Sequence, residues 1–136
     1  FLSCAHLILN LPWDDMEDSI EASKLMSVFD VDFIKLHSLY IAEGTQMAKQ
    51  YKNNEFEVCS LDEYRDRVVQ FLRYLSPKAC VERIVSRAPK ENTLFANWDR
   101  SSWYVRDYIE NYMRENGFYQ GQLYNYGCGK AVDRFF

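Results

Sequence analysis

The sequence predicts an α/β fold with mainly parallel strands and flanking helices, and three observations support that prediction. The run CAHLILNL, residues 4–11, is short, almost continuously apolar and followed by Pro12, which is typical of a strand covered on both faces. An acidic segment and a helical stripe follow, and then a second apolar run over residues 31–40. A strand, a helix and a strand in this order form a βαβ unit, which implies a right-handed crossover and parallel strands.

Each element of this unit has a local signal. Asp14 or Asp15 can cap the helix, and the acidic run DDMED suits a helix N-terminus. The helix is expected over residues 16–29, and the second strand over residues 33–39. The apolar stripe of the helix consists of Met16, Ile20, Leu25, Met26 and Phe29.

The pattern of the residues after position 40 predicts two more long helices and a third strand. A short helix is expected over residues 46–51, after Gly44 and Thr45. Ser60 and Glu63 form a capping-box pattern in front of a helix over residues 61–75. A third strand is expected over residues 79–85, and a long loop follows it. The last helix is expected over residues 102–116. Residues 118–136 have no clean period, and their aromatic content predicts that they pack against another part of the chain.

Composition limits the class of protein. The 136 residues suffice for a single domain, and a hydrophobic content of 48% predicts a packed core. The net charge of −4 argues against nucleic acid as a partner through a broad basic surface, and leaves a local basic patch open. No apolar run approaches the roughly 20 residues that a membrane span requires. The four cysteines form no CxxC pair or zinc motif, so we expect a reduced, cytoplasmic protein without a metal site.

Side-chain alternation within the first two strands places polar residues on one face. His6 and Asn10 share a face of the first strand, and Lys35 and His37 share a face of the second. If the aliphatic faces pack on helices, these four residues point the other way. Asn10 and His37 lie near the carboxyl ends of their strands, where such folds bind ligands. A simple hydrogen bond within the sheet is the preferred interpretation for His6. For His37, beside Tyr40, a structural and a ligand-binding role are both open.

Three other motifs are weaker candidates for a functional site. The acidic cluster of residues 14–18 is better explained as a helix N-terminus than as a metal site. The segment YGCGK, residues 126–130, contains two glycines and a lysine but does not match a P-loop. Arg83 and Arg87 lie on alternate positions of the third strand. They could bind an anion or be ordinary surface arginines.

A set of motifs in order resembles a known family. The motifs are HLILNLP, IKLHSLY, EGT, MAKQY, SLDEY, ERIVSRAPK and a tryptophan followed by GFYQG. Together they resemble the C-terminal half of a radical S-adenosylmethionine (SAM) family of Fe–S oxidoreductases, an uncharacterised bacterial branch related to the Elongator catalytic subunit. The resemblance implies a C-terminal part of a partial (βα)6 barrel. Residues 4–11 and 33–39 would be its fifth and sixth strands, within one domain of residues 1–136 whose C-terminal extension begins at about residue 79.

The resemblance also implies cofactors. A parent enzyme of this family holds a [4Fe–4S] cluster on a three-cysteine loop and cleaves SAM to a 5′-deoxyadenosyl radical. The chain contains no such loop. We therefore expect the chain to be a fragment that lacks the cluster-binding half of the barrel. We expect Phe1 to mark the point where the longer protein was cut and not a natural start. We expect it to bind no cofactor and to be inactive alone. The alternative is a non-catalytic α/β binding or docking domain.

The resemblance also implies site residues, which are carried over from the family's motifs position by position. The family's Gly-Leu-Pro turn beside the SAM adenosine corresponds to Asn10, Leu11 and Pro12. The end of the family's sixth strand corresponds to His37, Ser38 and Leu39. The chain departs from the family at Asn10, where Gly is usual, and at Trp13 and Asp14, where Gly-Glu is usual. Lys35, Tyr40 and Arg83 are expected to contact substrate.

Two partners are expected. The first is the N-terminal half of the barrel. The second is another copy of the chain, because an open barrel exposes the edge of the strand over residues 4–11 and the lumen face bearing His6 and Lys35. The aromatic segment 118–136 could cover this opening instead.

Overall fold

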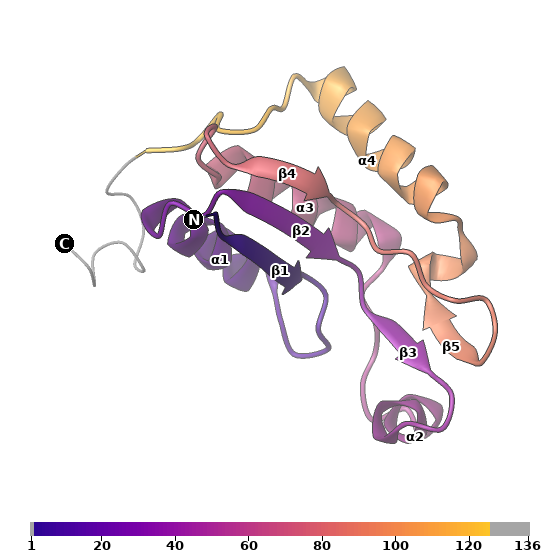
Figure 1. Ribbon diagram of the computed structural model, residues 1–136. Coiled ribbons are helices and arrows are strands. Elements are labelled where there is room, and N and C mark those ends of the chain that lie inside the picture. Colours follow the sequence, from indigo (N-terminus) through magenta and orange to yellow (C-terminus); the bar gives the residue numbers. More distant parts are fainter. Residues whose placement is uncertain (1, 126–136) are drawn as a thin grey trace.

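The computed structural model describes residues 2–125, and its centre is a three-stranded parallel sheet (Figure 1). The strands are β1 (Cys4–Ile8), β2 (Phe33–His37) and β4 (Cys80–Arg83), in the order β1-β2-β4. Both neighbouring pairs are parallel. The predicted α/β class and the predicted parallel pairing of the first two strands are therefore confirmed.

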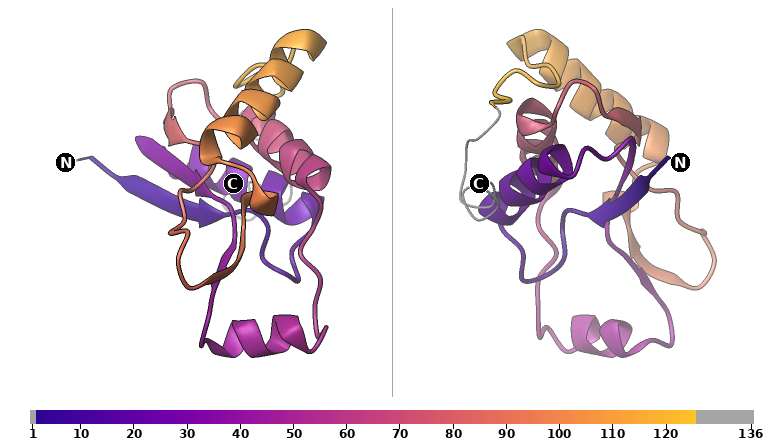
Figure 2. Two further views of the ribbon diagram at one scale, coloured as in Figure 1. Left: turned by 90° about the vertical axis from the view of Figure 1, so that its right-hand side faces the viewer. Right: turned by 60° about the vertical axis from the view of Figure 1, so that its left-hand side comes forward.

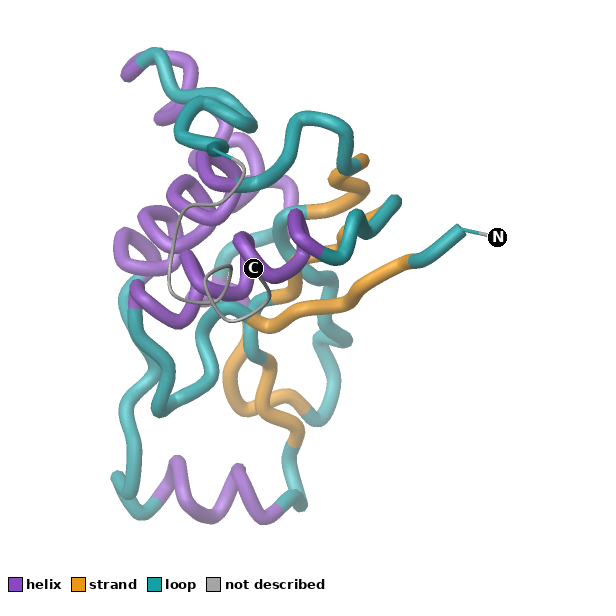
Figure 3. Tube along the Cα trace, turned by 90° about the vertical axis from the view of Figure 1, so that its left-hand side faces the viewer, coloured by secondary structure: helices purple, strands orange, loops and turns teal. Residues whose placement is uncertain are grey.

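Helices cover one face of this sheet. Helices α1 (Met16–Val28) and α3 (Leu61–Tyr74) lie behind it in Figure 1, and α4 (Ser102–Asn116) packs beyond α3. Figure 3 shows these helices as one layer and the strands as another. Ile34 and Leu36 of β2 are fully buried against Tyr64, Val68 and other side chains of α3. No described helix has both the length and the apolar character that a membrane crossing would require.

The helix boundaries follow local capping chemistry. The Asp15 carboxylate accepts a hydrogen bond from the Asp18 amide, and Asp18 reciprocates at the Asp15 amide. The Ser60 and Ser101 hydroxyls accept from backbone amides at the starts of α3 and α4. Gly117 ends α4 with φ of 70°, a left-handed conformation that glycine adopts without steric cost. The three predicted long helices agree with the structure to within one residue at each end.

A second, two-stranded sheet was not predicted. Strand β3 (Tyr40–Ala42) pairs antiparallel with β5 (Thr93–Ala96), which lies inside the predicted long loop. The short helix α2 (Gln46–Lys52) follows β3, and a single turn, η1 (Asn97–Asp99), follows β5. β2 ends at His37, two residues before the predicted end. Residues 38–39 leave the first sheet and lead into the second, as both views of Figure 2 allow the reader to follow.

The buried side of α1 differs from the predicted stripe. Ser19 and Ser23 are the buried residues of this helix, whereas Phe29, assigned to the apolar stripe, is 59% exposed. Ser23 Oγ donates a hydrogen bond to the Phe71 carbonyl of α3 at 2.5 Å. Small residues permit the backbones of α1 and α3 to approach closely, and Ala22 and Met26 of α1 also pack against the core.

The described part of the C-terminal segment packs on the helical side. The Gly121 and Leu123 amides donate to the Leu72 and Arg73 carbonyls at 3.0 and 2.8 Å. The Gln120 side chain donates to the Ser76 and Ala79 carbonyls. Residues 118–125 therefore lie over the end of α3 and leave the opposite face of the sheet uncovered. The segment YGCGK lies outside the described residues.

Candidate functional site at the carboxyl ends of the parallel strands

Within residues 2–125, one face of the first sheet carries no helix, and we call it the open face. It is formed by Cys4, His6 and Ile8 of β1 and by alternate residues of β2, because neighbouring residues of both strands point into the core. Ile8 is 41% exposed there, whereas Ile34 and Leu36 on the other face are fully buried. In a closed barrel, this open face would line the lumen.

Two histidines meet on the open face. His6 Nδ1 and His37 Nε2 are 3.0 Å apart, and the two rings are stacked at an interplanar angle of 10°. A hydrogen bond at this distance requires one nitrogen to hold a proton and the other to accept it. His6 thus forms a hydrogen bond within the sheet, as its preferred interpretation requires. The pair can exchange a proton across two neighbouring strands.

The surroundings of His37 favour the neutral form of its imidazole. Burial lowers the pKa of His37, and the positive charges of His6, Arg83 and Lys35 lower it further. Lys35 lies beside the pair on β2 and forms an ion pair with Glu82 of β4 at 3.4 Å. The open face therefore presents two hydrogen-bonded imidazoles next to a charge-paired lysine.

Asn10 ties the two strand ends together. Its side-chain oxygen accepts a hydrogen bond from the Leu39 amide at 2.7 Å, and Asn10 is only 1% exposed. Arg67 of α3 donates to the Leu9 carbonyl at 3.0 Å, directly beside this contact. Among the described residues, Asn10 Nδ2 is buried without a hydrogen-bond partner. Asn10 thus fixes the separation of the segments that follow β1 and β2.

Ser38 belongs to a buried polar network. Ser38 Oγ donates to Asn97 Oδ1 at 2.5 Å, and Asn97 Nδ2 donates to the Ser86 carbonyl at 2.8 Å. Ser86 Oγ donates to the Ser38 carbonyl at 2.9 Å. This network joins the end of β2, the segment after β4 and the turn after β5.

The turn at Asn97 has unusual backbone geometry. Asn97, Trp98 and Asp99 have φ values of 47°, 52° and 59°. Consecutive left-handed residues other than glycine are costly, at about 1–2 kcal/mol each, and such strain tends to persist where surrounding contacts over-determine it. Here the Asn97 network and the hydrogen bond from Trp98 Nε1 to the Cys59 carbonyl, at 2.8 Å, hold the turn. The sequence offered no signal for this turn beyond the tolerance of asparagine for positive φ.

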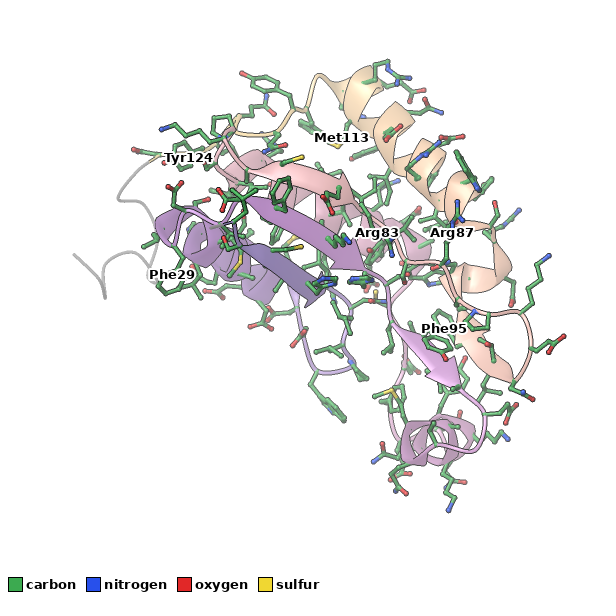
Figure 4. All side chains as sticks on the ribbon, viewed as in Figure 1. Phe29, Arg83, Arg87, Phe95, Met113 and Tyr124 are labelled. Carbon is green, nitrogen blue, oxygen red and sulfur yellow. The ribbon has the colours of Figure 1, made fainter. Side chains whose placement is uncertain are left out.

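A cleft of about 880 Å³ lies below the strand ends. Leu11 and Pro12 form one wall, and Cys59 and Arg67 line it from the segment before α3 and from α3 itself. Phe95, labelled in Figure 4, lines it from β5. Burial raises the pKa of the Cys59 thiol, so this cysteine is a neutral, weakly polar part of the wall.

The predicted site residues fall into three groups. Asn10, His37, Ser38 and Leu39 come together at the carboxyl ends of β1 and β2, where Asn10, Ser38 and Leu39 are buried. Leu11 and Pro12 border the cleft, and Lys35 lies on the open face. Tyr40 is exposed at the start of β3, and Arg83 is exposed at the end of β4. Their roles in cofactor and substrate binding remain predictions.

The cysteines of the described region do not fit an iron–sulfur cluster. Cys4, Cys59 and Cys80 are free thiols on different elements. Within residues 2–125, no three histidine, cysteine or acidic side chains gather as they would around a metal ion. Cys128 lies outside these residues.

Comparison with known proteins identifies the family. The profile of the radical SAM C-terminal domain matches residues 31–115. The uncharacterised protein YtqA of Bacillus subtilis is 33% identical over 121 residues, which are 89% of this chain and 38% of that protein. YhcC of Escherichia coli is 27% identical over 114 residues, 84% of this chain and 37% of that protein. The chain thus spans less than two fifths of the length of these curated relatives.

A solved structure has the same fold. The chain of Methanocaldococcus infernus Elp3 with an N-terminal deletion superposes with a TM-score of 0.71. The match has 17% sequence identity and covers 88% of this chain and 28% of the archaeal one. The parallel sheet, the flanking helices and the order of these elements therefore correspond to part of the Elp3 fold. With the profile match over more than half of its residues, the chain belongs to the radical SAM C-terminal domain family.

Proposed function

We propose that the chain is the C-terminal part of the barrel of a radical SAM Fe–S oxidoreductase whose substrate is unknown. In this proposal, β1 and β2 are the fifth and sixth strands of the barrel, and the open face lines its lumen. The observation that supports it most strongly is the parallel sheet with helices on one face and the His6–His37 pair on the other. Family membership supports the same assignment.

The residues of this chain would position the cofactor and control a proton. Together with a [4Fe–4S] cluster, bound SAM supplies a 5′-deoxyadenosyl radical in enzymes of this family. The Asn10–Leu39 hydrogen bond would hold the Leu11–Pro12 backbone and the end of β2 at a fixed separation on either side of the adenosine. The His6–His37 pair would donate or accept a proton within the lumen.

The absence of a three-cysteine loop from the sequence supports a second part of the proposal, that the chain alone is inactive. Anaerobic reconstitution with iron and sulfide, followed by visible absorption and a 5′-deoxyadenosine assay, tests this. We expect no stoichiometric cluster and no SAM cleavage by the isolated chain. A stoichiometric [4Fe–4S] chromophore would contradict the proposal.

A titration with SAM tests the position of the site. In ¹⁵N-resolved NMR spectra, the amides of residues 10–13 and 37–40 should shift first. The substitution His37→Gln should weaken these shifts, whereas Cys80→Ser, at the opposite end of the sheet, should leave them unchanged. Shifts confined to α4 or to residues 118–125 would place binding elsewhere and refute the assignment.

One observation favours the alternative of a non-catalytic docking domain. Ile8, Leu11, Trp13 and Tyr40 are large apolar side chains that are each at least 37% exposed near the strand ends. Exposed apolar groups of this kind are frequent at protein interfaces. The encoded sequence upstream of Phe1 discriminates between the two functions, because a three-cysteine loop there supports the enzyme and its absence supports the docking domain.

A further inference from the structure

Basic side chains converge on the first turn of α4, far in sequence from the candidate cofactor site. Two neighbouring cavities of about 600 and 410 Å³ flank Trp103, and Arg87, Ser102 and Trp103 line both of them. Figure 4 labels Arg83 and Arg87, which lie between the end of β4 and α4. We call the two cavities together the Trp103 groove.

The Trp103 groove is strongly cationic in an acidic protein. Its cationic residues are Arg83, Arg87, Lys90, Arg100 and Arg106, and its carboxylates are Glu82 and Asp99. Glu82 is already paired with Lys35, and Arg106 is paired with Asp107 at 3.3 Å. Within residues 2–125, Arg83, Arg87, Lys90 and Arg100 form no ion pair. Four cations without a carboxylate partner therefore share one groove, although the chain has a net charge of −4.

Aromatic rings lie beside three of the guanidinium groups of the groove. The Arg106 and Arg87 guanidinium carbons lie 4.3 and 5.8 Å from the centre of the Trp103 ring. Arg100 lies over the Tyr104 ring at 4.8 Å. Stacking on a ring uses the face of a guanidinium group and leaves its N–H groups directed sideways, which pre-organises them for an acceptor. Arg106 Nε is buried and has no partner among the described residues.

The N-terminus of α4 adds positive potential to the same place. Ser101 caps this 15-residue helix, and Ser101 and Ser102 both border the groove. The free backbone amides of a helix N-terminus favour a nearby negative charge. The three contributions, which are unpaired cations, stacked guanidinium groups and a helix N-terminus, therefore act on one groove.

We infer that the Trp103 groove binds phosphate groups of a ligand. A guanidinium fork fits both carboxylate and phosphate. With Asp99 counted, the cations that line the groove exceed its carboxylates by three, and one ligand carboxylate would offset only one of these charges. A phosphate monoester has a charge of about −1.5 to −2 at neutral pH, and successive phosphodiesters spread several charges along a groove. The groove therefore matches a ligand with several phosphate charges, either a free nucleoside polyphosphate or the backbone of a nucleic acid strand.

Binding measurements on the full 136-residue chain test the inference. The probes are ATP, followed by calorimetry, and a short fluorescein-labelled single-stranded oligonucleotide, followed by anisotropy over a series of salt concentrations. We expect saturable binding of at least one probe. The double substitution Arg87→Gln with Arg100→Gln should weaken it at least about tenfold. For the single-stranded oligonucleotide, this variant should reduce the slope of log affinity against log salt by about 1.4, because each phosphate contact contributes about 0.7 to that slope.

A matched variant separates the groove from general electrostatics. Lys49→Gln with Lys78→Gln also removes two positive charges, but from exposed positions outside the groove, and it should change affinity less than twofold. Trp103→Leu keeps the net charge and removes the stacking platform, so it should also weaken binding. Circular dichroism checks that each variant is folded.

The outcomes identify the ligand or overturn the inference. If ATP binds more tightly than the oligonucleotide, the ligand of the groove is a free nucleoside polyphosphate. Preference for the oligonucleotide with a steep salt dependence indicates a nucleic acid backbone. Absence of saturable binding of both probes at low salt, or an equal loss in the groove variant and the lysine variant, would overturn the inference.

Discussion

The stability of the folded chain depends on pH through His37, which contacts His6 on the open face. Because the pKa of His37 is lowered in the folded chain, the unfolded chain takes up the proton first as the pH falls. The stability that this neutral histidine contributes is present above its ordinary pKa of about 6.5. It decreases as the pH falls below that value, and the loss is complete below the lowered pKa of the folded state.

Titration of the histidine rings by NMR tests this relation. His37 should titrate below pH 6.5. In the variant His6→Gln its midpoint should rise, because one positive charge is removed, but it should stay below 6.5 since burial is the larger cause. Cys4→Ser, which changes a neighbour of His6 without removing a histidine, should leave the midpoint in place. A midpoint at or above 6.5 in the unmodified chain would contradict the expected burial.

Asn97 is the second residue with a testable effect. Asn97→Ala removes its hydrogen bonds to Ser38 and Ser86 at a buried position and places alanine at φ of 47°. We expect a loss of about 2–4 kcal/mol in the free energy of unfolding, measured in urea. Asn92 is exposed and has φ of 55°. Asn92→Ala therefore incurs only the backbone strain, and we expect a loss of about 1 kcal/mol. Equal losses at both positions would show that the Ser38 network contributes nothing.

At the scale of secondary-structure elements, the packing of α1 on α3 depends on small side chains. Ser23 is fully buried at this contact and donates to the Phe71 carbonyl. Ser23→Ala removes one hydrogen bond without changing the separation of the helices, and should cost about 1 kcal/mol. Ser23→Leu must push the helices apart and should cost about 2–4 kcal/mol. Thermal unfolding followed by circular dichroism measures both. A leucine variant as stable as the alanine variant would show that the helix contact is loose.

The arrangement of the elements also explains how the candidate site is held. β1 and β2 bring the strand ends together, but Arg67 of α3 and Asn97 of η1 hold the segments that follow them. The βαβ unit, α3 and η1, which are far apart in sequence, therefore support one short edge of the sheet. A substitution in α3 or η1 can disturb residues 38–39 without touching the strands themselves.

For the molecule as a whole, the surface that residues 2–125 leave uncovered favours association. β1 is an edge strand, Ile8 is exposed on the open face, and residues 118–125 lie on the other side of the sheet. Unpaired strand edges and exposed apolar groups both promote pairing with another chain. We therefore propose a homodimer that uses the β1 edge or the open face bearing His6 and Lys35.

Size exclusion with light scattering measures this association. The unmodified chain should have a dimer mass at high concentration. Ile8→Lys places a charge on the open face and should give a monomer. Leu123→Lys makes the same change at another exposed apolar residue, on the helical side, and should remain a dimer. A strict monomer at high concentration would refute the proposal, as would dimers of equal stability in both variants.

Elements whose signals are local could be predicted from the sequence alone. Apolar runs, helical stripes and capping residues such as Asp15, Ser60 and Ser101 depend on neighbours within a few positions, and they located the parallel strands and the three long helices. Alternation also placed His6 and His37 on one face of the sheet. These properties were predictable because strand period, helix period and capping chemistry act over one or two turns of chain.

Features that join distant residues could not be predicted in this way, because they depend on the tertiary fold. β3 pairs with a partner more than 50 residues away, and neither three- nor four-residue segment has a strong signal of its own. The left-handed turn at Asn97 exists because Ser38 and Ser86 hold it. The convergence of Arg83, Arg87 and Arg100 on Trp103 likewise depends on how α4 packs beside β4. Each of these is set by the free energy of a nonlocal contact, which short stretches of sequence do not encode.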